Sequence, residues 1–225
     1  MSPARYDGLA DWYDTWSERP AVASFSAEAI AAVLRLLGPG PGRCLDVGCG
    51  GGRLVVELAD AGWTATGADL SADQLRIAEL RAGERAEALV QTDAASLPFA
   101  AGAFDAVVST FTHTDLDQPE AVFGECARVL ARGGRLVYAG THPCFVGPYA
   151  HPTDAGVLVP PGYWDGRLHF DAPGFGNGVR RLAGARHVPL AALLNHVSAA
   201  GLALDRVEEA YGDPPGILAF RASKR

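Results

Sequence analysis

The sequence has almost no lysine, no long apolar run and no apolar leader segment. Lys224 is the only lysine among 225 residues, and the formal net charge at pH 7 is −7. Clusters of lysine and arginine bind phosphate backbones, so this charge argues against a nucleic-acid partner. No segment approaches the ~20 consecutive apolar residues that cross a bilayer, and the N-terminus carries charges where a secretory signal is apolar. We therefore expect a cytoplasmic protein without a nucleic-acid or membrane partner.

The sequence also lacks a C-x-x-C pair. Its four cysteines are Cys44, Cys49, Cys126 and Cys144. Structural zinc sites usually draw on closely paired cysteines, so we expect no metal. Free thiols are typical of a reducing compartment.

Helical and strand patterns alternate along the chain, which is typical of a parallel α/β sheet. Strands are predicted at 43–47, 63–69, 87–93, 103–110, 135–140, 202–210 and 216–223. Helices are predicted at 26–38, 51–62, 71–83, 118–134 and 189–201. The last two strands are expected to form a hairpin at the sheet edge. The length fits one domain, 1–225, in which residues 1–38 form N-terminal cap helices.

Residues 141–188 interrupt this alternation. They contain four of the six histidines, several aromatic residues, and many of the prolines and glycines, without a sustained period. An irregular segment of this length inside a compact domain is usually functional, so we predict a substrate-binding insert.

The stretch RCLDVGCGGGR, residues 43–53, runs from a predicted strand into a glycine cluster. Glycines let a ligand approach the backbone, and free amides at a helix N-terminus can donate hydrogen bonds to it. A dinucleotide fingerprint needs a glycine where Arg53 stands. Asp46 would repel a pyrophosphate but suits a ligand that carries positive charge.

Four segments in order resemble the class I S-adenosylmethionine-dependent methyltransferases, in particular their small-molecule, methyltransferase-11-like members. LDVGCGGG matches the first motif of that family, and GADLS (67–71) resembles the second. QTDAASLPFAAGAFDAVVST (91–110) and ECARVLARGGRLVYAG (125–140) are similar to the adenine-binding region and to the helix before strand five. The resemblance implies a three-layer α/β/α Rossmann-like sandwich, whose mostly parallel seven-stranded sheet has an antiparallel last strand.

The resemblance also implies the cofactor S-adenosyl-L-methionine and its product S-adenosyl-L-homocysteine. Asp69 would accept from the ribose hydroxyls, Asp93 and Ala94 would contact adenine, and Asp46 would face the ammonium group. The full set expected to bind the cofactor is Asp46, Gly48, Cys49, Gly50, Gly52, Asp69, Leu70, Asp93, Ala94, Ser109 and Tyr13.

Two histidines follow predicted strands at the end where the acceptor would approach. His142 is the preferred candidate for a general base and His113 the second, although for His113 we favour a role in bracing its loop. Positioning alone can also accelerate an in-line methyl transfer. The residues expected to bind substrate are Tyr6, His142, Phe145, Tyr149, Trp164 and His169, to which Tyr163, Phe170 and Phe175 add apolar surface. Arg180, Arg181 and Arg186 form a basic patch that could hold a substrate carboxylate, although we expect a solvated face.

The expected function is methyl transfer to an oxygen, nitrogen or carbon atom of a small apolar or aromatic metabolite. The composition indicates a GC-rich bacterial genome, which favours a natural product as acceptor. Three alternatives stay open: an enzyme that uses the cofactor for rearrangement or cyclisation, an NAD-dependent oxidoreductase, and a cofactor sensor. Monomer and homodimer are both compatible with the sequence.

Overall fold

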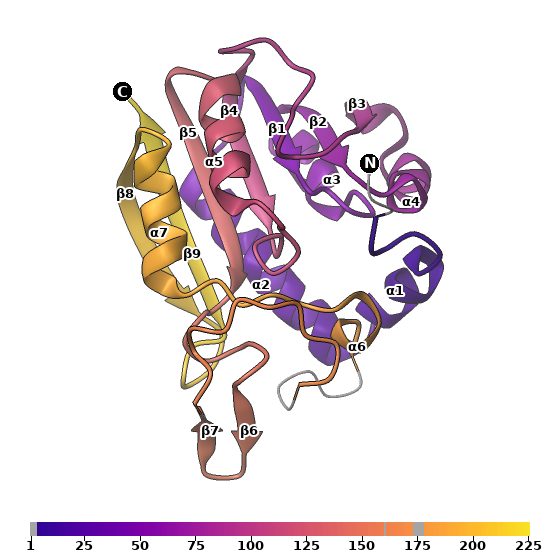
Figure 1. Ribbon diagram of the computed structural model, residues 1–225. Helices are drawn as coiled ribbons and strands as arrows, with labels where there is room; N and C mark the ends of the chain where they lie inside the picture. Colours follow the sequence, from indigo (N-terminus) through magenta and orange to yellow (C-terminus); the bar gives the residue numbers. More distant parts are fainter. Residues whose placement is uncertain (1–3, 160, 173–177) are drawn as a thin grey trace.

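Seven strands form one mixed sheet within residues 4–159, 161–172 and 178–225, the part of the chain described by the computed structural model (Figure 1). They are β1 (Arg43–Val47), β2 (Thr64–Asp69), β3 (Ala86–Gln91), β4 (Phe104–Thr110), β5 (Leu130–Thr141), β8 (Leu202–Ala210) and β9 (Ile217–Lys224). Their spatial order is β3-β2-β1-β4-β5-β9-β8. Strands β1 to β5 are parallel, and β9 runs antiparallel to both β5 and β8. The predicted seven-stranded sheet with an antiparallel last strand is confirmed.

Helices cover both faces of this sheet. They are α2 (Pro20–Leu37), α3 (Arg53–Asp60), α4 (Ala72–Ala82), α5 (Pro119–Val129) and α7 (Leu190–Ala199), and a short 3-10 turn, Gly83–Arg85, follows α4. Successive strand residues point to opposite faces, so Val107 joins the core under α5 and α7, while Val108 joins the core under α2 and α3. The predicted three-layer sandwich is therefore confirmed.

The end of α5 corrects one predicted boundary. The helix expected at 118–134 ends at Val129, and β5 begins at Leu130, which pairs with Phe104 of β4. An irregularity in that pairing accommodates Gly133, whose φ is +77°. The ammonium group of Lys224, the single lysine, donates to the carbonyl oxygens of Ala127 and Leu130, both at 2.7 Å. This contact satisfies carbonyls that the helix end leaves without a partner.

Two helices form the N-terminal part. The helix α1 (Ala10–Ser17) precedes α2, which begins six residues earlier than predicted, with Pro20 in its first turn. By length and composition alone α2 is apolar enough to cross a membrane. In the structure its residues Ala29, Val33 and Leu37 are buried in the core below the sheet. The helix thus has the role of a core helix here.

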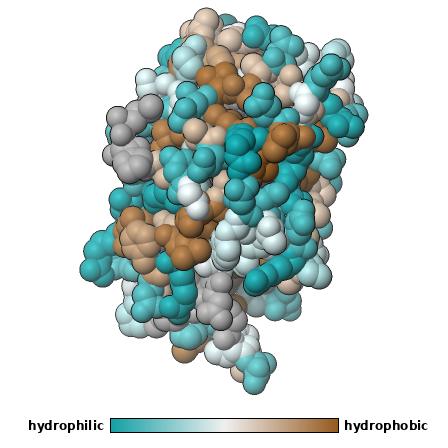
Figure 2. All heavy atoms as spheres, turned by 90° about the vertical axis from the view of Figure 1, so that its right-hand side faces the viewer, coloured by the Kyte–Doolittle hydropathy of each residue, from teal (hydrophilic) through white to brown (hydrophobic). Residues whose placement is uncertain are grey.

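Ion pairs attach α1 to the body of the protein. Asp11 pairs with Arg76 of α4 at 2.7 Å, and Asp14 pairs with Arg81 of the same helix. Asp14 also lies 3.8 Å from Arg53 at the start of α3. Figure 2 shows the side of the molecule on which α1 and α4 lie in Figure 1, and hydrophilic side chains there separate small apolar groups.

The insert 141–188 has more regular structure than expected. It contains a hairpin of β6 (His151–Thr153) and β7 (Gly156–Leu158), which projects from the body in Figure 1, and the short helix α6 (Arg180–Ala183). The rings of Tyr149 and Tyr163 pack edge-on against each other at 5.5 Å, and each packs edge-on against the ring of His187. Phe175 lies outside the described residues.

Candidate active site

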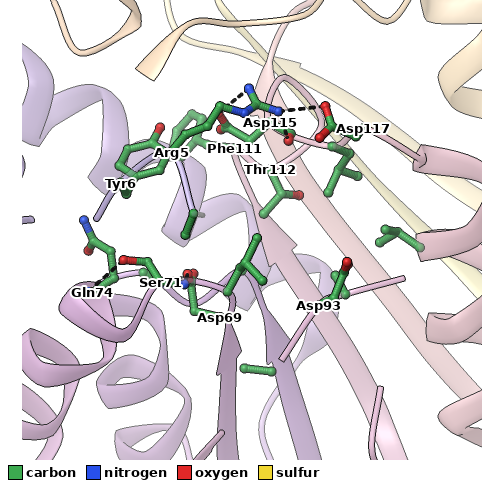
Figure 3. Close-up of a pocket in the computed structure, with 18 of the residues that line it drawn as sticks. Arg5, Tyr6, Asp69, Ser71, Gln74, Asp93, Phe111, Thr112, Asp115 and Asp117 are labelled. Carbon is green, nitrogen blue, oxygen red and sulfur yellow. Dashed lines mark hydrogen bonds and ion pairs between the residues drawn. The ribbon is translucent and has the colours of Figure 1, made fainter. Parts of the chain in front are cut away.

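A cavity of about 320 Å³ lies at the carboxyl ends of the parallel strands (Figure 3). We call its sheet side the floor, which consists of Gly48, Gly50, Asp69, Leu70, Asp93 and Ala94. We call the opposite side the roof, which consists of Arg5, Tyr6, Tyr13 and Arg180. The loop after β4, from Thr110 to Gln118, forms a side wall. Parallel α/β sheets place ligands at this edge, and the volume is near the lower end of ~300–1,000 Å³ for ligand pockets.

Asp69, the last residue of β2, is the best-defined polar group of the floor. Its carboxylate accepts hydrogen bonds from the amides of Gly50 at 2.8 Å and Ser71 at 2.9 Å. Burial raises its pKa, and these two amides act in the opposite direction. Because each carboxylate oxygen can accept more than one hydrogen bond, Asp69 retains capacity for two ligand hydroxyls.

Ser71 caps the start of α4. Its hydroxyl accepts from the amide of Gln74 at 3.2 Å, which is an N-cap hydrogen bond. The same hydroxyl donates to Asp7 at 2.7 Å. This residue therefore connects the floor to the N-terminal segment.

The glycines of the loop after β1 have different roles. Gly48 and Gly50 line the cavity, with φ of +73° and +50°. Gly52 does not line it, although its φ of +77° also favours glycine. An added Cβ at Gly52 would lie 2.9 Å from the Cβ of Ala78, so this glycine allows α3 to approach α4 closely. Cys49 is buried and does not line the cavity either.

Asp46 lies beneath the floor, two residues before Gly48. It is 0% exposed, and both carboxylate oxygens lack a hydrogen-bond partner. Burial, followed by the nearby charge of Asp69, raises its pKa to about 8. A cationic ligand in the cavity would stabilise the ionised form of both carboxylates.

Three further predicted cofactor residues differ in whether they line the cavity. Asp93 and Ala94 line the cavity, and Asp93 accepts from the amide of Ala95 at 2.9 Å, which shapes the turn after β3. Ser109 does not line it, because its hydroxyl donates to the carbonyl of Val47 at 2.8 Å and bonds to Thr112 at 2.7 Å. Ser109 therefore positions Thr112 on the side wall.

Neither histidine predicted as a base lines the cavity. Nδ1 of His142 accepts from the amide of Cys144 at 3.2 Å, and Nε2 lies 2.7 Å from Oε1 of Glu209 on β8. His113 is buried, and its Nδ1 bonds to the hydroxyl of Tyr138. Burial lowers the pKa of His113 to about 3. Its position fits the alternative in which it braces the loop.

Of the residues predicted to bind substrate, Tyr6 lines the cavity, as does the predicted cofactor residue Tyr13. Burial raises the pKa of both phenols. The other predicted contacts lie elsewhere: Phe145 packs on His142, Tyr149 packs on His187, Trp164 is 79% exposed, and His169 pairs with Ala185. None of the described aromatic residues of the insert lines the cavity, and Phe145, Tyr149, Tyr163 and Trp164 pack against other rings of the insert.

No sequence pattern predicted the carboxylate partners of Arg5 and Arg180. Arg180 pairs with Asp115 at 2.6 Å, and Arg5 pairs with Asp117 at 3.1 Å. Arg186 also pairs with Asp117, at 2.9 Å. The expectation of a solvated basic patch is therefore wrong for Arg180 and Arg186. The one local signal was the pair of aspartates, spaced by two, in the loop after β4.

Phe111 on the side wall was also missed. Its φ of +58° is unusual for a bulky residue, and its ring stacks on Phe25 of α2 at 5.5 Å. Backbone conformations of this kind often occur at functional sites. No sequence pattern marks a non-glycine residue in this conformation.

Comparison with known proteins extends the sequence resemblance. Residues 45–138 match the family described as a methyltransferase domain. A malonyl-[acyl-carrier protein] O-methyltransferase of Geobacter sulfurreducens is 40% identical over 139 residues, which are 60% of this chain and 51% of that protein. A demethylmenaquinone methyltransferase of Renibacterium salmoninarum is 32% identical over 148 residues, which are 65% of this chain and 61% of that protein. The chain thus spans little more than half the length of these relatives.

A solved structure shares the fold over nearly the whole chain. An S-adenosylmethionine-dependent methyltransferase of Mesorhizobium loti superposes with a TM-score of 0.69 at 21% identity, covering 88% of this chain and 96% of that one. The matched domain includes the floor of the cavity from Gly48 to Ala94. Residues 45–138 are therefore similar to a methyltransferase domain, and the chain shares the fold of the Mesorhizobium loti enzyme.

Proposed function

We propose that the protein transfers the methyl group of S-adenosylmethionine to an oxygen, nitrogen or carbon atom of a small-molecule metabolite. The observation that carries the proposal is the position of Asp69, a buried carboxylate at the end of β2 that faces a cavity bordered by Gly48 and Gly50. This arrangement suits a nucleoside whose ribose has two adjacent hydroxyls.

The floor fits the cofactor in charge as well as in shape. Asp69 would hold the ribose, and Asp93 and Ala94 would border the adenine. The unpartnered carboxylate of Asp46 adds negative charge beneath Gly48. When bound, S-adenosylmethionine supplies a methyl group on a positively charged sulfur. The aromatic rings of Tyr6, Tyr13 and Phe111 line the same cavity, and aromatic faces attract cations by about 0.5–2 kcal/mol.

The proposal assigns no general base. Among the described residues that line the cavity there is no histidine and no cysteine. Holding two reactants in line can account for up to ~7–11 kcal/mol of barrier reduction without proton transfer. The roles proposed for this chain's residues are therefore to bind the cofactor, to orient the acceptor and to exclude water.

The acceptor is proposed only as a class. The two relatives described above are named for different acceptors, a malonyl-acyl carrier and demethylmenaquinone. Because the chain spans only part of each, neither acceptor transfers directly to it. We propose an apolar or aromatic metabolite, and a natural product in particular.

Labelled cofactor tests this proposal. The protein is incubated with S-adenosylmethionine that carries an isotopic methyl group and with a metabolite extract of the source cells, and label is followed by mass spectrometry. A labelled small molecule is expected. A metabolite that changes without gaining label would instead indicate rearrangement or cyclisation. Thermal protection by NAD but not by S-adenosylhomocysteine would favour the oxidoreductase.

A further inference from the structure

Ion pairs connect the arginines of the roof to the aspartates of the side wall. Arg5, Arg180 and Arg186 meet two carboxylates, those of Asp115 and Asp117, in one network. Two of the three guanidinium groups, those of Arg5 and Arg180, line the cavity, whereas Arg186 does not. Figure 3 shows Arg5, Asp115 and Asp117 across the cavity from Asp69 and Asp93. The sheet side of the cavity is therefore anionic, whereas on the opposite side two arginines, Arg5 and Arg180, face two aspartates, Asp115 and Asp117.

One donor nitrogen in this network has no hydrogen-bond partner. Nη2 of Arg5 donates to Asp117 and to the carbonyl oxygen of Asp115. Nη1 of Arg5 is buried and has no hydrogen-bond partner. Its distance to Oδ1 of Asp115 is 3.7 Å, which allows an ion pair but is too long for a hydrogen bond. Buried donors normally have partners, so this N–H group is suited to an acceptor atom on a ligand.

The carboxylates of this network, in contrast, offer no free position to a cationic group of a ligand. Asp115 already faces both Arg5 and Arg180, and Asp117 faces both Arg5 and Arg186. A ligand amine would compete with these guanidinium groups, whereas a ligand carboxylate would add the missing acceptor. Guanidinium and carboxylate are also matched in shape and charge.

The positions of the roof residues along the sequence indicate which ligand they contact. Arg5 and Arg180 both lie outside residues 45–138, the segment shared with the family. Asp69, Asp93 and the cavity glycines lie inside it. Apart from Tyr6 and Tyr13, the residues proposed to hold the cofactor lie in this shared segment. The charged residues outside it are better placed to contact what differs between enzymes, which is the acceptor.

We propose that Arg5 and Arg180 form a subsite for a carboxylate group of the methyl acceptor. This inference rests on the proposed function. It narrows the acceptor from small metabolites in general to those that carry an acidic group near the methylated atom.

The cofactor has a carboxylate of its own, so the experiment must separate the two sources. The probes are S-adenosylhomocysteine and 5′-methylthioadenosine, which has the nucleoside and the sulfur but no amino-acid tail. Benzoate represents the acceptor's carboxylate, and benzamide is its neutral counterpart. Binding is measured by titration calorimetry for the full chain and for two variants, Arg5→Gln and Arg186→Gln. Arg186→Gln is the matched control, because Arg186 pairs with the same Asp117 but does not line the cavity.

The proposal predicts that benzoate binds the protein loaded with S-adenosylhomocysteine at least tenfold more tightly than benzamide does. Arg5→Gln should lose at least tenfold in benzoate affinity, and Arg186→Gln should remain within twofold of the unmodified chain. Both variants should bind S-adenosylhomocysteine normally.

Two results would overturn the inference. If Arg5→Gln lowers the affinity for S-adenosylhomocysteine tenfold but leaves the affinity for 5′-methylthioadenosine unchanged, the subsite holds the carboxylate of the cofactor itself. If benzoate shows no preference over benzamide, there is no carboxylate subsite. If the protein prefers benzoate to benzamide as expected but no metabolite gains labelled methyl, the carboxylate subsite is supported and the proposed methyl transfer is contradicted.

Discussion

The floor and the roof of the cavity are built by different means. Strand ends and backbone amides form the floor: Asp69 is fixed by two amides, and Gly48 and Gly50 follow β1 directly. The roof depends on side chains from distant segments, because Arg5 and Arg180 meet at the loop that carries Asp115. A rigid floor suits a ligand common to a family, and a roof held by ion pairs can vary between relatives without disturbing the sheet.

The largest expected effect concerns the packing of α3 on α4 behind the floor. Gly52→Ala places a Cβ 2.9 Å from the Cβ of Ala78 at a φ of +77°. The left-handed conformation and the overpacking together should lower the free energy of unfolding by about 2–4 kcal/mol, measured by urea denaturation. Gly201→Ala is the control, because Gly201 has a φ of +79° but nothing lies within 4 Å of its added Cβ. Equal losses in both variants would contradict the close packing of α3 on α4.

Asp69→Asn tests the floor as a binding surface. The amide keeps one acceptor oxygen but loses the charge, so affinity for S-adenosylhomocysteine should fall by about 1.5–3 kcal/mol, measured by calorimetry. Asp60→Asn removes a carboxylate from a surface pair with Arg85 and should leave affinity unchanged. Unchanged affinity in Asp69→Asn would mean that the ribose is held elsewhere.

The ionisation of Asp46, beneath the floor, makes the stability of the folded protein dependent on pH. Its pKa is about 8 in the folded protein and near the usual 3.8 in the unfolded chain. Between these values the folded state holds a proton that the unfolded state has released, so stability should fall as the pH rises through this window. Asp46→Asn should remove this dependence of stability on pH. It should also raise the free energy of unfolding of the ligand-free protein by about 1–3 kcal/mol at pH 8. Parallel urea midpoints for the two proteins from pH 5 to pH 8 would contradict this.

The smallest effect is expected in the roof. Asp115→Asn removes the carboxylate with which both Arg5 and Arg180 form partly buried ion pairs. This change should lower the free energy of unfolding by about 1–2 kcal/mol. Hydrogen exchange should accelerate in residues 4–18 and in α6, while β1 and β2 keep their protection. Asp60→Asn, whose ion pair is more than half exposed, should change stability by less than about 0.5 kcal/mol. Faster exchange in β1 would show that floor and roof are not independent.

The same contrast explains what could be predicted from the sequence. The bounds of β1 and the serine cap of α4 depend on neighbouring residues, so a local pattern contains them. The pairs Arg5–Asp117 and Arg180–Asp115 join residues 112 and 65 positions apart, and no local pattern encodes them.

Two errors have the same origin. The helical pattern beyond Val129 gave way to pairing between Leu130 and Phe104, a contact across the sheet. His142 does follow β5 as predicted, but the neighbouring hairpin brings Glu209 to its Nε2. Such partners become known only when the strand order is known.

That strand order also affects how the sheet is completed during synthesis. In the described part of the chain β8 pairs only with β9, and β9 lies between β8 and β5. When β8 leaves the ribosome it has no edge to join until β9, made afterwards, has paired with β5. A chain interrupted before Ile217 would therefore lose two strands from the sheet, because β8 would have no neighbour.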